Sequence, residues 1–348
     1  MTLLRLSATG LARSHFAVSP LAETVGSLIA LHRPCAWPWL ARWHSENLPA
    51  YRSWLAGNAV AAGLLGLVSA TKWFPDVVSV PPSGGVDTRL ADELAEVAAQ
   101  SDAEVLATIE DAAASTGCST TGAWLPAGGA GSRIAAVLEE GWHRFVERDW
   151  PRRHAVIERE ITYRAELVAA HGWQRAVKGM TRRSVWVEPD AIRFSNQSWS
   201  DRDIGDHGLV FVPYTARQGS WTCERPGRYA LVYPARGAAV QPERAHSDPV
   251  SVLLGAGRAR VAVELRTPAT STQLAAVLDL SLGTVSAHLA VLRQAGVVSR
   301  TRSGRHVVYR LTERGSGLLD LLGDRDAQNT AGTGERRWPL PRSSGGTG

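Results

Sequence analysis

The sequence is poor in residues that mark several large classes of protein. Lysine occurs only at positions 72 and 178, so arginine supplies nearly all of the 38 basic residues. The three cysteines, at positions 35, 118 and 223, lie far apart and form no C-x-x-C pair. This usage excludes a disulfide-rich secreted domain and is typical of reduced thiols in a cytoplasmic protein.

Long apolar runs are also missing. The apolar run at residues 59–68 is well short of the roughly 20 residues that a helix needs to span a bilayer. Arg5 and Arg13 interrupt the N-terminus before a hydrophobic region of signal-peptide length develops. We therefore expect a cytoplasmic protein that has no membrane partner.

The motifs of common enzymes and metal sites are absent as well. The chain contains no G-x-S-x-G, H-E-x-x-H or G-x-x-x-x-G-K-[ST]. The oxygen-rich run 201–207 lacks the glycine and glutamate positions of a calcium loop, so a polar hairpin loop fits it better. No cysteine follows residue 250, which argues against a thiolate metal site there. We predict no metal, no cofactor and no enzymatic activity.

The chain is long enough for more than one domain, and its positive charge is concentrated in one segment. Its 348 residues, 44% of them apolar, suffice for two or three domains with buried cores. Residues 251–315 contain nine arginines against three acids, whereas the formal net charge of the whole chain is only +5. This balance indicates contact between the C-terminal segment and a polyanion such as a nucleic acid.

Residues 1–240 form one predicted domain. Helical periodicity dominates to about residue 180, and Gly172 is placed to close a long helix. Between residues 181 and 236 the apolar residues alternate or run continuously, which predicts a small antiparallel sheet. Residues 3–6 add a short edge strand. The predicted fold class is α+β, with a mostly helical N-terminal domain.

Two features of this domain leave alternatives open. Five tryptophans gather in its first part and either line a pocket for a flat apolar ligand or fill a large core, which is the commoner use. They are Trp37, Trp39, Trp43, Trp54 and Trp73. Residues 87–111 carry eight acids against one arginine. That face either repels DNA and holds the basic segment inactive, or is an ordinary solvated helix face, the more frequent case.

The most informative stretch lies near the C-terminus. Thr270 and Gln273 are spaced as the capping box of a short helix. Ser281 is a suitable N-cap for a second helix, which Gly296 can end. The tight turn at Asp279 between the two predicts a helix-turn-helix.

Two arginine-rich strands are predicted around a turn at residues 303–304, which completes a winged helix-turn-helix over 248–322. The run L-S-x-x-T-V-S-x-H-L-x-x-L-x-x-A-G-V-V, followed by V-Y-x-L-T, resembles the ArsR-type winged-helix family of bacterial transcription regulators. The first two-thirds of the chain is more weakly similar to an actinobacterial domain of unknown function. Residues 323–348 lack periodicity and are predicted to be a disordered tail.

Helix geometry predicts which side chains face DNA. With Val285 inward, small and uncharged residues point outward, whereas His288 lies near the apolar side and serves packing or DNA contact. Relatives often carry a long polar or basic side chain at the position of Ala287, so specificity is expected to depend on its neighbours and on the wing. The predicted DNA contacts are Thr284, Ser286, Ala287, His288, Arg293, Gln294, Arg300, Arg302, Arg305 and His306.

The resemblance implies a sequence-specific regulator of transcription, a repressor that binds a double-stranded DNA operator as a homodimer. The N-terminal domain is then expected to sense a small-molecule effector or to supply dimer surface. The alternative is that the N-terminal domain is an uncharacterised enzyme that carries an accessory DNA-binding domain.

Overall fold

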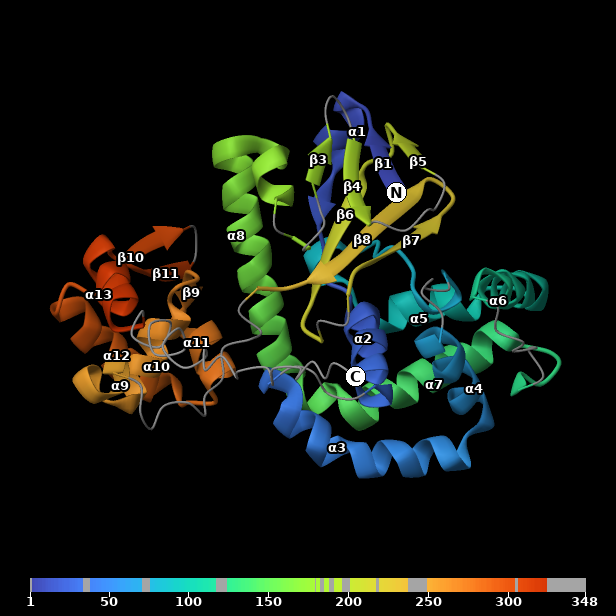
Figure 1. The fold of residues 1–348 in the computed structure, drawn as a ribbon, viewed down its shortest axis with the longest axis horizontal. Coiled ribbons are helices and arrows are strands. Elements are labelled where there is room, and N and C mark those ends of the chain that lie inside the picture. The colour runs from blue at the N-terminus through green and yellow to red at the C-terminus, as the bar shows by residue number, and fades with distance from the viewer. Residues whose placement is uncertain are drawn as a thin grey trace, which may run out of the picture.

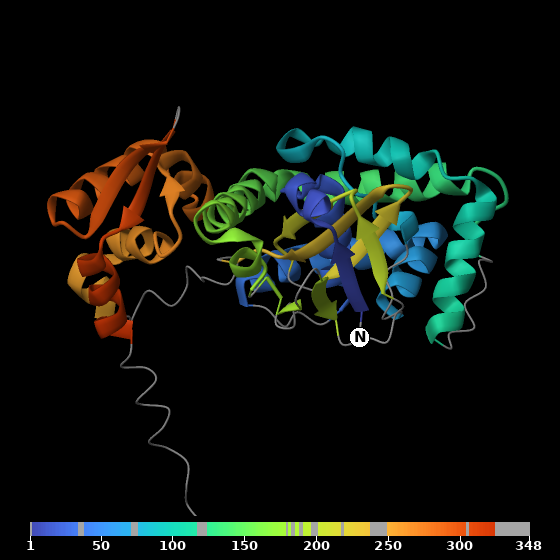
Figure 2. The same cartoon turned by 90° about the horizontal axis from the view of Figure 1, so that it is seen from above.

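The computed structural model describes residues 2–33, 38–70, 76–116, 124–178, 180–181, 185–187, 191–195, 201–216, 219–236, 249–303 and 306–323. These residues form two parts, which lie side by side in Figures 1 and 2. The N-terminal part ends at Arg236 and the C-terminal part begins at Pro249. The predicted boundary at 240–248 lies outside the described residues, as does the predicted tail of 323–348 apart from Gly323, which ends the last helix.

The N-terminal part combines helices with short strands. Its α-helices are α1 (Ala8–Arg13), α2 (Pro20–His32), α3 (Pro38–Gly57), α4 (Ala59–Ala70), α5 (Leu90–Ala98), α6 (Asp102–Thr116), α7 (Ala130–Phe145) and α8 (Trp150–Val177). Its strands are β1 (Thr2–Leu6), β2 (His15–Phe16), β3 (Val185–Val187), β4 (Ala191–Ser195), β5 (Arg202–Gly205), β6 (Leu209–Tyr214), β7 (Trp221–Arg225) and β8 (Arg228–Pro234). Gly172 has a φ of 75° and breaks the helical path of α8, as its sequence position predicted.

The strands form two sheets, not one. The first has the order β3-β4-β1-β5, in which β1 is antiparallel to β4 and parallel to β5. The second has the order β2-β6-β8-β7, in which β2, β6 and β8 are parallel and only β7 is antiparallel. The prediction of a small antiparallel sheet is therefore confirmed only in part, and β1 lies inside its sheet, not at the edge.

The apolar pattern explains why the second sheet differs from the prediction. Phe211 and Leu231 pack against the first sheet, whereas Val212 and Val232 pack against α2 and α8. Both faces of this sheet are therefore buried between layers. Continuous apolar runs are typical of strands buried on both faces, which are often parallel, because crossing segments cover the sheet.

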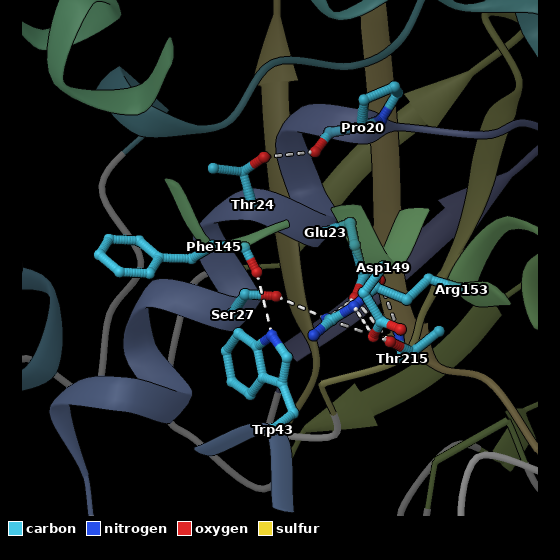
Figure 3. A network of polar contacts seen from close by, with 9 residues as sticks. All are labelled: Pro20, Glu23, Thr24, Ser27, Trp43, Phe145, Asp149, Arg153 and Thr215. Carbon is cyan, nitrogen blue, oxygen red and sulfur yellow. Dashed lines mark hydrogen bonds and ion pairs between the residues drawn. The ribbon is translucent and has the colours of Figure 1, made fainter. Parts of the chain in front are cut away.

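A buried ion pair joins these layers, as Figure 3 shows. Arg153 of α8 donates a hydrogen bond to the carboxylate of Glu23 of α2 (2.5 Å), and both side chains are fully buried. The same guanidinium bonds Asp149 (2.9 Å), and Glu23 accepts hydrogen bonds from the backbone and hydroxyl of Thr215, at the end of β6. The indole of Trp43 on α3 covers the guanidinium, 4.6 Å from its carbon to the ring centroid.

The C-terminal part is a small helical bundle with a three-stranded sheet. Its elements are α9 (Pro249–Leu254), α10 (Ala256–Glu264), β9 (Ala269–Thr270), α11 (Ser271–Leu278), α12 (Leu282–Gln294), β10 (Val298–Ser303), β11 (His306–Leu311) and α13 (Glu313–Gly323). The sheet order is β10-β11-β9. The apolar spacing of residues 250–266 predicts one helix with Leu253 inward, but Gly255 adopts a φ of 80° and divides the stretch into α9 and α10. Leu253 is 61% exposed.

Removing Arg153 tests the central ion pair. Arg153→Met keeps the length of the side chain but leaves the carboxylate of Glu23 buried without its partner. We expect the free energy of unfolding to fall by about 3–5 kcal/mol, measured by urea denaturation. Arg144→Met, which breaks the half-exposed pair with Glu140, is the matched control and should cost less than about 1 kcal/mol. Equal losses of unfolding free energy in the two variants would contradict the larger contribution that we expect from the buried pair.

Glu93 of α5 should make stability depend on pH. Burial raises the pKa of its carboxyl to about 8, although hydrogen bonds from Ser19 and the Leu21 amide oppose the shift. The native state therefore retains a proton that the unfolded state loses from about pH 4.5, and stability should fall as pH rises from there through 8. The slope contributed by one such group approaches about 1.4 kcal/mol per pH unit.

Glu93→Gln imitates the protonated acid and should flatten this dependence in urea denaturation series between pH 5 and 8. Burial also raises the pKa of Asp76 to about 7, so part of the slope should remain. Glu110→Gln, on the exposed side of α6, should leave the slope unchanged. A wild-type slope in the Glu93→Gln variant would show that Glu93 is ionised in the native state.

Candidate nucleic-acid interface

Helices α11 and α12 form the predicted helix-turn-helix. The Gln273 amide donates to Thr270 Oγ1 (3.2 Å) and the Thr270 amide donates to Gln273 Oε1 (2.9 Å), which confirms the capping box of α11. Asp279 ends α11 with a φ of 53°, a left-handed turn that aspartate tolerates better than most residues. The two helices are bent by 116° relative to each other, within the range for this motif.

Both ends of α12 are set by the residues that the sequence indicated. Ser281 Oγ accepts a hydrogen bond from the Thr284 amide (3.1 Å), which confirms it as the N-cap. Gly296 ends the helix with a φ of 71°. Its amide donates to the Arg293 carbonyl and the Val297 amide donates to the Leu292 carbonyl. This is the Schellman pattern, which satisfies carbonyls that would otherwise lack donors.

The outer face of α12 is small and mostly uncharged. Val285, Leu289 and Leu292 are buried in the core of the C-terminal part. The predicted contacts that are exposed along α12 are Thr284, Ser286, Ala287, Arg293 and Gln294. Leu282 and Val291 are also exposed, which the prediction did not include. The short side chains of Thr284, Ser286 and Ala287 allow the first half of α12 to approach a groove closely.

His288 has a packing role in the structure. Its ring lies against α10 at Gly257, where a Cβ would come within 2.5 Å of the imidazole Nε2. A larger residue than glycine at this position would force the ring to move. The alternative prediction, that His288 contacts DNA, stays a prediction.

The hairpin beside α12 presents two arginines on one face. Arg300 lies opposite Tyr309, and Arg302 lies opposite Val307. Because side chains alternate along a strand, Arg300 and Arg302 share a face, and both are exposed. Arg305 and the side chain of His306 lie outside the described part of the structure.

The C-terminal part is docked on α8, which separates it from the two sheets in Figure 1. Arg159 of α8 pairs with the Glu264 carboxylate and also donates to the carbonyls of Glu264 (2.6 Å) and Thr267 (3.0 Å). Arg159 and Glu264 are each only 4% exposed. A guanidinium at the C-terminal end of α10 also meets the negative end of the helix dipole. These buried contacts therefore attach the C-terminal part specifically to α8.

Two weaker contacts extend the same interface. Gln273 of α11 donates to the Glu158 carboxylate (3.2 Å), and Arg310 of β11 lies 3.5 Å from that of Glu166. Sequence reasoning missed this interface. One signal was present: Glu264 is one of only three acids within 251–315, and its negative charge has a partner on α8.

The described residues offer no other chemistry of an obvious kind. No group of three or more histidine, cysteine, aspartate or glutamate side chains among them is placed to hold a metal ion. The Cys223 thiol is buried, and burial raises its pKa to about 12. Within the same residues no single helix is long and apolar enough to cross a membrane; α11 and α12 pass that test only as a bent pair.

Comparison with known proteins gives one match. Residues 265–300 match the family model described as "Bacterial regulatory protein, arsR family". The matched segment runs from the end of α10 through α11 and α12 into β10. It supports an ArsR-type helix-turn-helix, and with it DNA binding in transcription regulation. No curated protein matches the chain.

The Ser281 cap should control the stability of α12. Ser281→Ala removes the side-chain acceptor for the Thr284 amide and should lower the free energy of unfolding by about 1 kcal/mol. Ser286→Ala, on the exposed face of the same helix, should be neutral or slightly stabilising because alanine favours helices. Thermal unfolding of the two variants separates capping from surface effects; equal stabilities would contradict the capping role.

Proposed function

We propose that the chain is a sequence-specific DNA-binding repressor of transcription that acts in the cytoplasm and has no catalytic activity. The observation that carries the proposal is the pairing of the small outer face of α12 with the arginine-bearing hairpin of β10 and β11. A helix of this kind enters the major groove, where the donor and acceptor pattern differs for each base pair. The hairpin serves as a wing, whose arginines bind phosphates or the minor groove.

Helix α12 and the hairpin of β10 and β11 contribute differently to DNA recognition. Ala287 has no polar atom beyond the backbone, so it touches at most a thymine methyl group. Thr284, Ser286 and Gln294 are the residues of α12 that can hydrogen-bond to base edges. Arg300 and Arg302 supply most of the affinity that does not depend on sequence.

We further propose that the regulator is a homodimer. Val252 and Leu253 on α9 are 82% and 61% exposed, and Leu321 on α13 is 73% exposed. Helices α9 and α13 contact each other, so these side chains belong to neighbouring elements. Large apolar side chains that gather on a surface favour association. A two-fold dimer through this surface would present two copies of α12 to a palindromic operator.

The N-terminal part is proposed to sense an effector. The C-terminal part is docked on α8 of this part through buried contacts, so a change in the conformation of the N-terminal part can alter the position of α11. A ligand regulates DNA binding only if its affinity differs between the DNA-competent and DNA-incompetent states.

Selection of bound duplexes from random DNA tests the proposal. We expect the full chain to enrich a two-fold symmetric motif, and recovery of no motif would overturn sequence-specific binding. A single asymmetric half-site would instead contradict the dimer while supporting specific recognition.

The contribution of the wing can be measured separately. Replacing Arg300 and Arg302 with alanine should weaken binding to all sequences, because phosphate contacts do not read bases. The slope of log Kobs against log salt should become shallower by about 1–2, measured by fluorescence anisotropy at several salt concentrations. Arg133→Ala on α7, in the N-terminal part, is the control. An unchanged slope in the double variant would contradict the wing assignment.

A further inference from the structure

A cleft of about 850 Å³ lies where the N-terminal part meets the helix-turn-helix. One wall comes from α3 and from the junction of α7 and α8, and includes Arg42, Trp43, Arg148 and Arg152. The opposite wall is α11 with the turn that follows it, and includes Ala276 and Asp279. This volume falls in the range of small-molecule sites.

The charged side chains of the cleft favour an anion. Four arginines and three acids line it. The lining therefore carries one more positive than negative charge. Partners outside the lining do not enlarge this excess, because Arg144 pairs with Glu140, and Arg153, which bonds Asp149, also pairs with Glu23. Arg148 contributes to the excess from an exposed position and makes no ion pair with the residues that the structure describes.

Arg152 is the arginine of the cleft lining whose pKa is lowered by its surroundings. Burial lowers the pKa of its guanidinium, and the neighbouring Arg153 lowers it further, against the opposing effects of Asp149, Glu264 and Asp279. An anion in the cleft would add to the negative charge that these acids already supply, and a guanidinium can donate planar, two-pronged hydrogen bonds to it.

Trp43 gives the cleft a flat apolar wall. Its indole is fixed from behind, because Arg153 lies against the ring and the indole N–H donates to the Phe145 carbonyl (3.0 Å). A fixed aromatic ring loses little conformational freedom when a planar group stacks on it. Ala275 and Ala276 also line the cleft, and their small side chains leave room for such a group.

We propose that this cleft binds a small organic anion, a carboxylate or phosphate that carries a flat apolar body, and that it is the effector site of the regulator. The second half of this proposal rests on the proposed function. The ligand would contact Arg148, Arg152 and Trp43 on one side and α11 on the other. Because Asp279 leads directly into α12, a ligand that fills the cleft changes the position of the recognition helix.

Titration calorimetry of the full chain without DNA tests the site. The probes are benzoate and phenyl phosphate, with benzamide and benzylamine as neutral and cationic controls of the same shape. We expect both anions to bind with dissociation constants below about 10 mM and the controls to bind at least tenfold more weakly. No anion binding, or equal binding of benzamide, would overturn the proposal.

Two variants locate the binding. Arg148→Gln changes an exposed residue and leaves the fold intact, so a loss of anion affinity of about tenfold assigns the binding to this cleft. Arg52→Gln, at an exposed position of α3 away from the cleft lining, should bind as the wild type does. Unchanged affinity in the Arg148→Gln variant would overturn the assignment.

Anisotropy with the selected operator separates the two halves of the proposal. Phenyl phosphate at a saturating concentration should change the operator affinity of the wild type but not of Arg148→Gln. Calorimetric binding at the cleft with unchanged operator affinity would support the binding site and contradict its role as effector site. Failure of the random-DNA selection would contradict the proposed function as a regulator. It would leave the calorimetric evidence for the binding site unchanged.

Discussion

The buried pair of Glu23 and Arg153 is the contact on which the N-terminal part depends. Burying two charges costs several kcal/mol each unless geometry and further hydrogen bonds compensate. Here Asp149, Ser27 and Thr215 supply those bonds. These contacts join α2, α8 and the end of β6 at one point. Trp43 brings α3 to the same point, so one cluster sets the position of three helices and a sheet.

Helix α8 transmits this arrangement to the DNA-reading part. On one side it holds Arg153 in the core, and one to two turns later Arg159 emerges to meet the end of α10. The same helix is therefore shared by the core of the N-terminal part and by the dock of the helix-turn-helix. The cleft lies at the start of α8, beside the first of these contacts. A ligand there would act on a joint that has little freedom to absorb the change locally.

Local features of the fold could be predicted from the sequence, whereas contacts between distant segments could not. The capping box at Thr270, the N-cap at Ser281 and the break at Gly172 each depend on neighbours within a few residues. The pairing of Leu4 with Ile192 and the ion pair of Arg159 with Glu264 join segments far apart. No periodicity or spacing encodes such partners. Of the clustered tryptophans, Trp54 is buried in the core, as the commoner interpretation predicted. Trp43 lines the cleft, so the ligand pocket stays a prediction, and the side chains of Trp37, Trp39 and Trp73 lie outside the described part of the structure.

The interior position of β1 delays the formation of its sheet during synthesis on the ribosome. Residues 2–6 pair with β4 and β5, which end at residues 195 and 205. At synthesis rates of 5–20 residues per second, roughly 10–40 s pass between the synthesis of β1 and that of β4 and β5. During that time its apolar side chains are exposed on a nascent chain. The N-terminal part therefore closes its first sheet late, shortly before the DNA-reading part is made.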